Sequence, residues 1–391
     1  MEHNRRHSFV WWFFRPLVQL IVWIKFNFTA KAVDIRGPYL VLCNHVTDWD
    51  PLLLGAAFRR QMYYVASEHI LRLGFVSRLL RFLVAPIARQ KGGSAAGTVK
   101  NVLRTIKAGC NVAIFPEGNR TWDGLTRDFP ASTAKLVRSC GCTLVTYRLH
   151  GGYFSSPRWS GSRVHRGKMR GELVGVYSPE ELKAMKVDEI NALIARDLRT
   201  DAYAEQKEAP IEYKSKTLAE DLETMLFTCP RCGTMHKLTS HGDTFRCGSC
   251  GMETHFTKTG YFEGGELPFD NILSWSRWQD EQLREFIAGA GENRLFSDNE
   301  IELYNVETAR KSTALGCGRL ELYADRLVLP TGITIMKENI SGMALQGAMK
   351  LYVSSSDGRH FQLRPKKGER RCMVKYLTAC GMLGAAVGYG V

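Results

Sequence analysis

The sequence lacks acidic residues over two long stretches. None occurs from His69 to Pro116 or from Phe129 to Gly171, although the 391-residue chain holds 39 Asp and Glu against 53 Lys and Arg. The net charge of +14 is therefore concentrated on either side of Glu117–Asp128, the only acidic segment between the two stretches. A local positive field of this kind favours anionic partners, such as nucleic acid, an anionic membrane or a phosphorylated substrate.

An uninterrupted membrane-spanning run is also missing. The apolar run Phe9–Ile24 is broken by Arg15 and Pro16 and is shorter than the roughly 20 residues that cross a bilayer. Its Trp and Phe residues and the flanking cations predict helices that lie in the headgroup layer or dip into one leaflet. We expect residues 1–35 to be this membrane-associated segment. A signal peptide is one alternative, since Ala30-Lys31-Ala32 mimics a cleavage site. A buried aromatic helix is the other.

The eleven cysteines are an odd number, which excludes a framework of disulfides alone. Four of them form two CxxC pairs, each followed by Gly: Cys229, Cys232, Cys247 and Cys250. This spacing predicts a zinc ribbon over residues 225–258, in which four thiolates hold a structural Zn²⁺. The residues between the pairs lack the basic and aromatic pattern of a nucleic-acid surface, so we expect no nucleic-acid partner.

From Tyr39 onward, short apolar runs alternate with helical patterns. The strands are expected at YLVLC, MYYVA, NVAIF and CTLVTYRL, and the helices at PLLLGAAF, ILRLGFVSRLLRFL, TVKNVLRTIKAG and AKLVRSCG. This order predicts an α/β domain over residues 36–220, with a mixed sheet that helices cover on both faces. Ligands bind at the carboxyl ends of such strands, which makes NH after YLVLC and PEG after NVAIF candidates by position.

The last part of the chain has a different pattern. A helical stretch, ILSWSRWQDEQLREFI, is followed by alternating segments such as KLYVSS and HFQLR and by the helix-like MVKYLTACGMLGAA. We expect residues 259–391 to form a small β-rich module of the pleckstrin-homology kind with a C-terminal helix. Its basic turn, Arg364–Arg371, suits contact with anionic lipid, and a solvated loop is an equal alternative.

The segment NHVTDWD places His45 five residues before Asp50 at an expected strand end. An Asp at this distance holds one ring nitrogen protonated and leaves the other to take a proton from a hydroxyl. Asp48 is a competing partner. No serine accompanies the pair, so the nucleophile would be an alcohol of the substrate, which attacks a thioester directly.

A second segment, FPEGNRT, follows about 70 residues later at another expected strand end. Gly118 allows close approach of the backbone, and Arg120 is a cation suited to a phosphate. Together, NHVTDWD and FPEGNRT resemble the NHxxxxD and FPEGxRS blocks of the 1-acylglycerol-3-phosphate acyltransferases and their glycerol-phosphate acyltransferase relatives. Thr121 stands where the family has Ser. The resemblance covers about half the chain.

The resemblance implies roles for residues of both segments. His45 would be the general base and Asp50 its orienting partner, while the substrate would be bound by Glu117, Gly118, Arg120, Thr121 and, from the PIAR segment, Arg89. The chain departs from the family at LVTYRLHGG, where Arg148 replaces an apolar residue. Arg148 is expected to add a phosphate contact, with a scaffold ion pair as the alternative.

The sequence therefore predicts an acyltransferase at the cytoplasmic face of the cell membrane, monotopic or peripheral, with an anionic membrane as partner. It would move a fatty acyl group from acyl-CoA or acyl carrier protein to the lysophospholipid 1-acylglycerol 3-phosphate. Glycerol 3-phosphate and other lysophospholipids are alternative acceptors. A catalytically inactive lipid-binding protein is the alternative outside the enzyme class.

Overall fold

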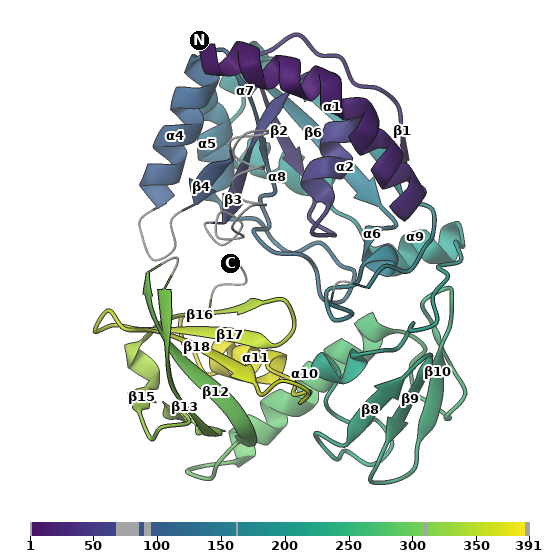
Figure 1. The fold of residues 1–391 in the computed structure, drawn as a ribbon, viewed down its shortest axis with the longest axis vertical. Helices are drawn as coiled ribbons and strands as arrows, with labels where there is room; N and C mark the ends of the chain where they lie inside the picture. The colour runs from purple at the N-terminus through teal and green to yellow at the C-terminus, as the bar shows by residue number, and fades with distance from the viewer. Residues whose placement is uncertain (1, 68–85, 90–94, 162, 309–310, 388–391) are drawn as a thin grey trace. The chain divides into compact units, whose positions relative to one another are not determined.

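The computed structural model describes residues 2–67, 86–89, 95–161, 163–308 and 311–387 (Figure 1). Two compact units account for these residues. The first unit comprises residues 1–157 and 164–213, and the second comprises residues 158–163 and 214–391. The helix predicted at ILRLGFVSRLLRFL lies outside the described residues.

A seven-stranded mixed sheet forms the centre of the first unit, with the strand order β1-β7-β6-β2-β5-β3-β4. All neighbouring strands are parallel except β6 and β7, which pair antiparallel. The mixed sheet of the prediction is thus confirmed. The strands are β1 (Thr29–Ala30), β2 (Tyr39–Cys43), β3 (Met62–Ser67), β4 (Ile87–Arg89), β5 (Asn111–Ile114), β6 (Thr143–His150) and β7 (Arg170–Tyr177).

Helices cover both faces of this sheet, and the alternation along β2 shows why. Val41 packs into a core with α1 and α2, whereas Leu40 packs into a second core with α4, α5 and α8, because successive side chains of a strand point to opposite faces. The helices are α1 (Glu2–Phe26), α2 (Asp50–Ala57), α4 (Ala95–Lys107), α5 (Ser132–Cys140), α6 (Gly152–Ser155), α7 (Pro179–Ala184), α8 (Val187–Leu198) and α9 (Ala202–Glu208).

Helix α1 packs along α2 with one face only. His7, Trp11, Val22 and Phe26 are buried at helical spacing, and the side chains of Arg15 and Gln19 both donate hydrogen bonds to the carbonyl oxygen of Ala56 at 3.0 Å. The opposite face exposes large apolar side chains: Phe9, Trp12, Phe13, Leu17, Leu20, Ile21, Trp23 and Ile24. By length and composition, residues 6–26 could also cross a membrane.

The second unit contains two antiparallel sheets. The smaller sheet has the order β11-β10-β9-β8, and the larger has the order β15-β14-β13-β12-β18-β17-β16. The smaller sheet consists of β8 (Leu238–His241), β9 (Thr244–Cys247), β10 (Glu253–Phe256) and β11 (Phe262–Glu263). The larger consists of β12 (Phe296–Thr308), β13 (Lys311–Leu322), β14 (Arg326–Val328), β15 (Thr334–Met336), β16 (Ile340–Gln346), β17 (Lys350–Ser355) and β18 (His360–Pro365).

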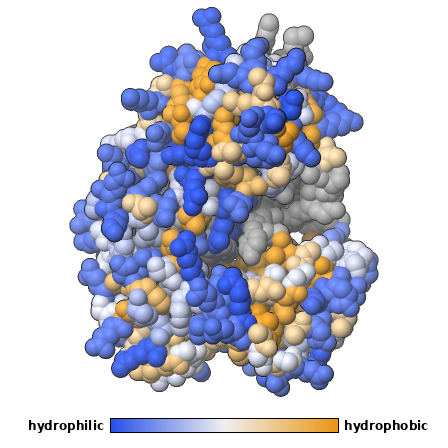
Figure 2. Space-filling model, turned by 180° about the vertical axis from the view of Figure 1, so that it is seen from behind, coloured by the Kyte–Doolittle hydropathy of each residue, from blue (hydrophilic) through white to orange (hydrophobic). Residues whose placement is uncertain are grey.

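Helix α10 (Ile272–Gly289) precedes the larger sheet and α11 (Val374–Met382) follows it, while two short 3₁₀ helices lie at Leu222–Thr224 and Lys337–Asn339. A β-rich C-terminal region with a closing helix is therefore present, and its pleckstrin-homology character stays a prediction. The surface seen in Figure 2 is mostly hydrophilic, with hydrophobic patches between the charged side chains.

The basic turn Arg364–Arg371 is largely neutralised within the second unit. Arg364 pairs with Glu302 at 2.7 Å, and Lys366 pairs with Glu300 at 3.0 Å. Arg370 contacts three carboxylates, those of Glu220, Asp221 and Glu223. Cations that pair with neighbouring acids produce only a weak net electrostatic field. The ion pairs therefore favour a scaffold role for this turn over a lipid-binding role.

Candidate active site

The two sequence motifs follow neighbouring parallel strands. Leu42 of β2 is in register with Ile114 of β5, so both strands reach their carboxyl ends at the same edge of the sheet. NHVTDWD begins directly after β2 and FPEGNRT directly after β5. The sheet topology therefore brings together two segments that are about 70 residues apart in the sequence, as expected for a site in an α/β sheet.

A fully buried carboxylate organises the first motif. Asp50 is 0% exposed, and its Oδ2 lies 2.7 Å from Nδ1 of His45. The same carboxylate accepts hydrogen bonds from the backbone N–H groups of Val46 and Thr47 and from the Thr47 hydroxyl, at 2.6 to 3.0 Å. Asp50 also begins α2, where the helix dipole favours a negative charge.

The tautomer of His45 follows from this contact. An ionised carboxylate can only accept hydrogen bonds, so Nδ1 of His45 must donate and carry the proton. In the neutral form of this tautomer, Nε2 carries no proton. The ring stacks on Phe115 with the centroids 4.8 Å apart, and 21% of the side chain is exposed. The imidazole is therefore fixed in orientation and open to solvent at one side, which suits a general base.

Asn44 fixes the backbone that carries His45. Its side-chain amide donates to the carbonyl oxygen of Leu149 at 3.0 Å and accepts from the N–H of Leu149 at 2.8 Å. The buried amide thus pairs with the backbone of β6 on both sides. Neither Asn44 nor Phe115 was singled out from the sequence, although both belong to the quoted motifs.

Glu117 joins the two motifs directly. Its Oε1 accepts a hydrogen bond from the backbone N–H of His45 at 2.7 Å, and its Oε2 accepts one from the N–H of Arg127 at 3.3 Å. Burial raises the pKa of the Glu117 carboxyl to about 8, against the two backbone donors, which favour the ionised form. This carboxyl therefore positions the His45 backbone, and its predicted contact with substrate stays a prediction.

Gly118 and Thr121 shape the turn of the second motif. Gly118 has a φ of +70°, a conformation that glycine adopts without steric cost, and its N–H donates to the carbonyl oxygen of Phe115. The Thr121 hydroxyl donates to Asp123 at 3.1 Å and accepts from the N–H of Gly124 at 3.0 Å. Thr121 is thus engaged within the turn, and its role toward substrate is not tested by these contacts.

Arg120 points back to the first motif. Its Nε lies 3.1 Å from Oδ1 of Asp48, and one of its terminal nitrogens donates to the carbonyl oxygen of Ser156 at 3.4 Å. The two candidate partners of His45 are thereby resolved by geometry. Asp50 contacts the imidazole, and Asp48 contacts the guanidinium.

The guanidinium of Arg148 lies on the face of the sheet opposite α2, and its expected phosphate contact stays a prediction. Tyr147 packs into the core beneath α2, so its neighbour Arg148 points to the opposite face. There its guanidinium donates to the carbonyl oxygens of Arg196 and Asp197, at the end of α8. A cation satisfies the unpaired carbonyls of a helix C-terminus well. These bonds are therefore compatible with a scaffold role of Arg148, at a helix end instead of at an acid.

Arg89 ends strand β4, where it is in register with Ser67 of β3. Its side chain lies outside the described residues, so its predicted contact with phosphate stays untested.

Cys43, which immediately precedes the first motif, is unsuited to nucleophilic catalysis. The thiol is completely buried, and burial together with the nearby Asp50 and Glu117 carboxylates raises its pKa well above the ordinary value. A thiol in such surroundings stays protonated and inert. Cys43 is therefore not a candidate nucleophile.

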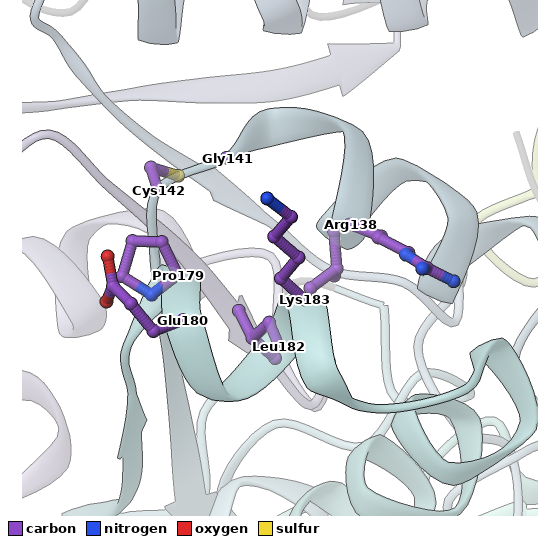
Figure 3. Close-up of a pocket in the computed structure, with 8 residues that line it drawn as sticks. Arg138, Gly141, Cys142, Pro179, Glu180, Leu182 and Lys183 are labelled. Atoms are coloured by element: carbon purple, nitrogen blue, oxygen red, sulfur yellow. The ribbon is translucent and has the colours of Figure 1, made fainter.

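A surface cavity of about 430 Å³ lies between α5 and α7 (Figure 3). Its lining includes Arg138, Cys142, Glu180 and Lys183. No residue of NHVTDWD or FPEGNRT contributes to it, so it is separate from the candidate site and does not bear on its chemistry.

The four ribbon cysteines of the second unit converge. Their Sγ atoms all lie within 4.8 Å of one another, with 3.7 Å between Cys229 and Cys250 and 3.9 Å between Cys232 and Cys247. A tetrahedral Zn²⁺ with Zn–S bonds of about 2.3 Å requires sulfur–sulfur distances of roughly 3.8 Å. The four cysteines thus fit a closed tetrahedral metal site.

Comparison with known proteins agrees with this geometry. The family model described as Acyltransferase matches residues 24–150, a range that includes both motifs and the strands that carry them. Residues 24–150 are an acyltransferase-family domain. The residues outside this range, including the ribbon and the larger antiparallel sheet, are not part of the match.

Individual relatives have low sequence identity to this chain. A 1-acyl-sn-glycerol-3-phosphate acyltransferase of Borreliella burgdorferi is 26% identical over 141 residues, which are 35% of this chain and 56% of that protein. The chain thus spans about half the length of that relative. The crystal structure of the 1-acyl-sn-glycerophosphate (LPA) acyltransferase PlsC from Thermotoga maritima is similar with a TM-score of 0.39 and 15% identity, over 50% of this chain and 80% of that one.

Proposed function

We propose that this protein transfers a fatty acyl group from a thioester to the free hydroxyl of 1-acylglycerol 3-phosphate, with His45 as general base. The observation that carries the proposal is the hydrogen bond of 2.7 Å between His45 and the buried Asp50. The acyltransferase family of residues 24–150 supports the reaction class, and the name of the Borreliella relative supports the acceptor.

In the proposed reaction, Nε2 of His45 takes the proton of the acceptor hydroxyl as its oxygen attacks the thioester carbonyl. Asp50 stabilises the imidazolium that forms, because its carboxylate lies against Nδ1. The tetrahedral intermediate then expels the thiolate, and the proton on His45 neutralises it. The products are the ester and the free thiol of coenzyme A or acyl carrier protein. Arg120 and Arg89 would hold the acceptor phosphate.

A panel of acceptors tests this proposal on the purified full chain. Wild-type protein should acylate lysophosphatidate with acyl-CoA, and His45→Ala should lower the rate by about 10²- to 10⁴-fold, the usual contribution of a general base. His360→Ala, at an exposed histidine of β18, is the matched control and should keep the wild-type rate. Release of free thiol and formation of labelled phosphatidate report the rate.

Each other result of the panel contradicts part of the proposal. Transfer only to glycerol 3-phosphate, or only to a lysophospholipid with another head group, would show that 1-acylglycerol 3-phosphate is not the acceptor. An unchanged rate in His45→Ala would exclude the mechanism. Absence of transfer to every acceptor would favour a lipid-binding protein without activity.

We propose further that α1 holds the enzyme at the membrane surface. Its exposed apolar face is suited to the acyl–headgroup boundary, while its other face is occupied by the contacts with α2. The C-terminal end of α1 also contacts the first motif, since Lys25 Nζ lies 3.9 Å from the centroid of the Trp49 ring. An acceptor that leaves the lipid beside α1 would thus emerge next to His45. The cytoplasmic face of the membrane is the expected location.

Vesicle flotation tests the role of α1. The double substitution of Trp12 and Phe13 by Glu should weaken binding to vesicles of phosphatidylcholine and phosphatidylglycerol at least tenfold, because each buried aromatic side chain contributes about 1.5–3 kcal/mol. Phe286→Glu, at an exposed Phe of α10, is the control and should leave binding unchanged. Equal binding of all three proteins would refute the proposal.

We also propose that the four ribbon cysteines bind one Zn²⁺ with a structural role. A closed site of four thiolates leaves no position for a substrate, so the metal would stabilise the ribbon and take no part in acyl transfer. Metal analysis should find about one zinc ion per chain in the wild type and in Cys317→Ser, an exposed cysteine of β13. Cys247→Ser should lose the zinc and lower the unfolding temperature. A metal-free wild type whose ribbon cysteines form disulfides would contradict the assignment.

A further inference from the structure

The exposed carboxylate of Asp48 is paired with the guanidinium of Arg120. The proposed function assigns this guanidinium to the phosphate of the acceptor. Oδ1 of Asp48 lies 3.1 Å from Nε of Arg120. Asp48 belongs to NHVTDWD and stands three residues after His45, whereas Arg120 belongs to FPEGNRT. The ion pair therefore spans the two motifs at the place where the proposed function brings the acceptor phosphate.

The two partners differ strongly in burial. The side chain of Arg120 is 7% exposed and that of Asp48 is 71% exposed. Arg120 also donates to the carbonyl oxygen of Ser156, so its guanidinium is held by the scaffold. The Asp48 carboxylate is mostly exposed to solvent and can leave Arg120 by rotation of one short side chain.

The contrast with Asp50 makes the role of Asp48 specific. Asp50 is fully buried and accepts hydrogen bonds from His45, Val46 and Thr47, so it cannot leave without breaking the loop. Among the residues that the structure describes, the Asp48 carboxylate pairs with Arg120. An ion pair with one exposed partner contributes little stability, and the exposed carboxylate exchanges readily for another anion at the same cation.

We propose that the carboxylate of Asp48 competes with the phosphate of the acceptor for Arg120. When the substrate binds, the phosphate replaces the carboxylate at this guanidinium. The inference rests on the proposed function, because it assumes that Arg120 receives the acceptor. A phosphate monoester offers more negative charge than a carboxylate and can bind the planar guanidinium with two oxygens. It therefore displaces Asp48, whereas a neutral acceptor has nothing to exchange for it. Asp48 thus sets the affinity of the site for phosphate-bearing acceptors.

Binding of glycerol 3-phosphate to the full chain, measured by calorimetry without an acyl donor, tests this role. Asp48→Asn should bind glycerol 3-phosphate about 2- to 10-fold more tightly than the wild type, a factor that corresponds to the loss of a partly exposed ion pair. Asp48→Glu restores the carboxylate and should return the affinity toward the wild-type value. Glycerol, which carries no charge, should show no difference between the proteins.

Asp34→Asn is the matched control. Asp34 is 47% exposed and lies 3.2 Å from Arg60, so this change removes the same charge from a similar ion pair outside both motifs, and it should leave the affinity for glycerol 3-phosphate unchanged. In acyl-transfer assays, the effect of Asp48→Asn should fall on KM rather than on kcat.

The outcomes separate this inference from the proposed function. Unchanged or weaker binding in Asp48→Asn, or equally tighter binding in Asp34→Asn, would overturn the competitor role even if acyl transfer is observed. Tighter binding in Asp48→Asn alone, in a protein that transfers no acyl group, would uphold the role of Asp48 and reject the enzyme. A loss of kcat in Asp48→Asn with unchanged binding would assign Asp48 to the loop structure and overturn the inference.

Discussion

The geometry of the site depends on the hydrogen bonds that one buried carboxylate, that of Asp50, accepts. Asp50 is removed from solvent, and a buried charge is tolerated only when hydrogen bonds compensate for its lost hydration. The backbone N–H groups of Val46 and Thr47, the Thr47 hydroxyl and the His45 ring all supply such bonds. The loop must therefore close around Asp50, and this closure determines the orientation of the imidazole.

The surrounding structure keeps that loop in place from three sides. Asn44 ties it to the backbone of β6, and Glu117 ties it to the second motif through the N–H of His45. Trp49, at the far end of the loop, contacts Phe26 and Lys25 of α1. The parallel pairing of β2 and β5 is what allows these contacts, because it brings both motifs to the same edge. Helix α1, His45 and Arg120 are thereby linked within one unit.

Much of this organisation could be predicted from local patterns. In the described part of the first unit, the alternation of strands and helices follows from apolar periodicity. The convergence of the four ribbon cysteines follows from their spacing.

The partners of single side chains could not be predicted in the same way. Asp48 and Asp50 are both within reach of His45 along the chain, and only the folded loop assigns one to the imidazole and the other to Arg120. The side to which Arg148 points depends on the pairing of β6 with β2 and on the position of α8. The bond from Glu117 to the His45 backbone depends on the register of β2 and β5. These are tertiary features, and no local pattern encodes them.

The tautomer of His45 tests the central claim most directly. Nitrogen-15 NMR of the full chain labelled at histidine would identify which ring nitrogen carries the proton at neutral pH, with His45→Ala to assign the signals. The account predicts that Nδ1 is protonated and that Nε2 is free, and that Asp50→Asn abolishes this preference. A proton on Nε2 in the wild-type protein would contradict it, because the nitrogen that faces the acceptor could not then act as a base.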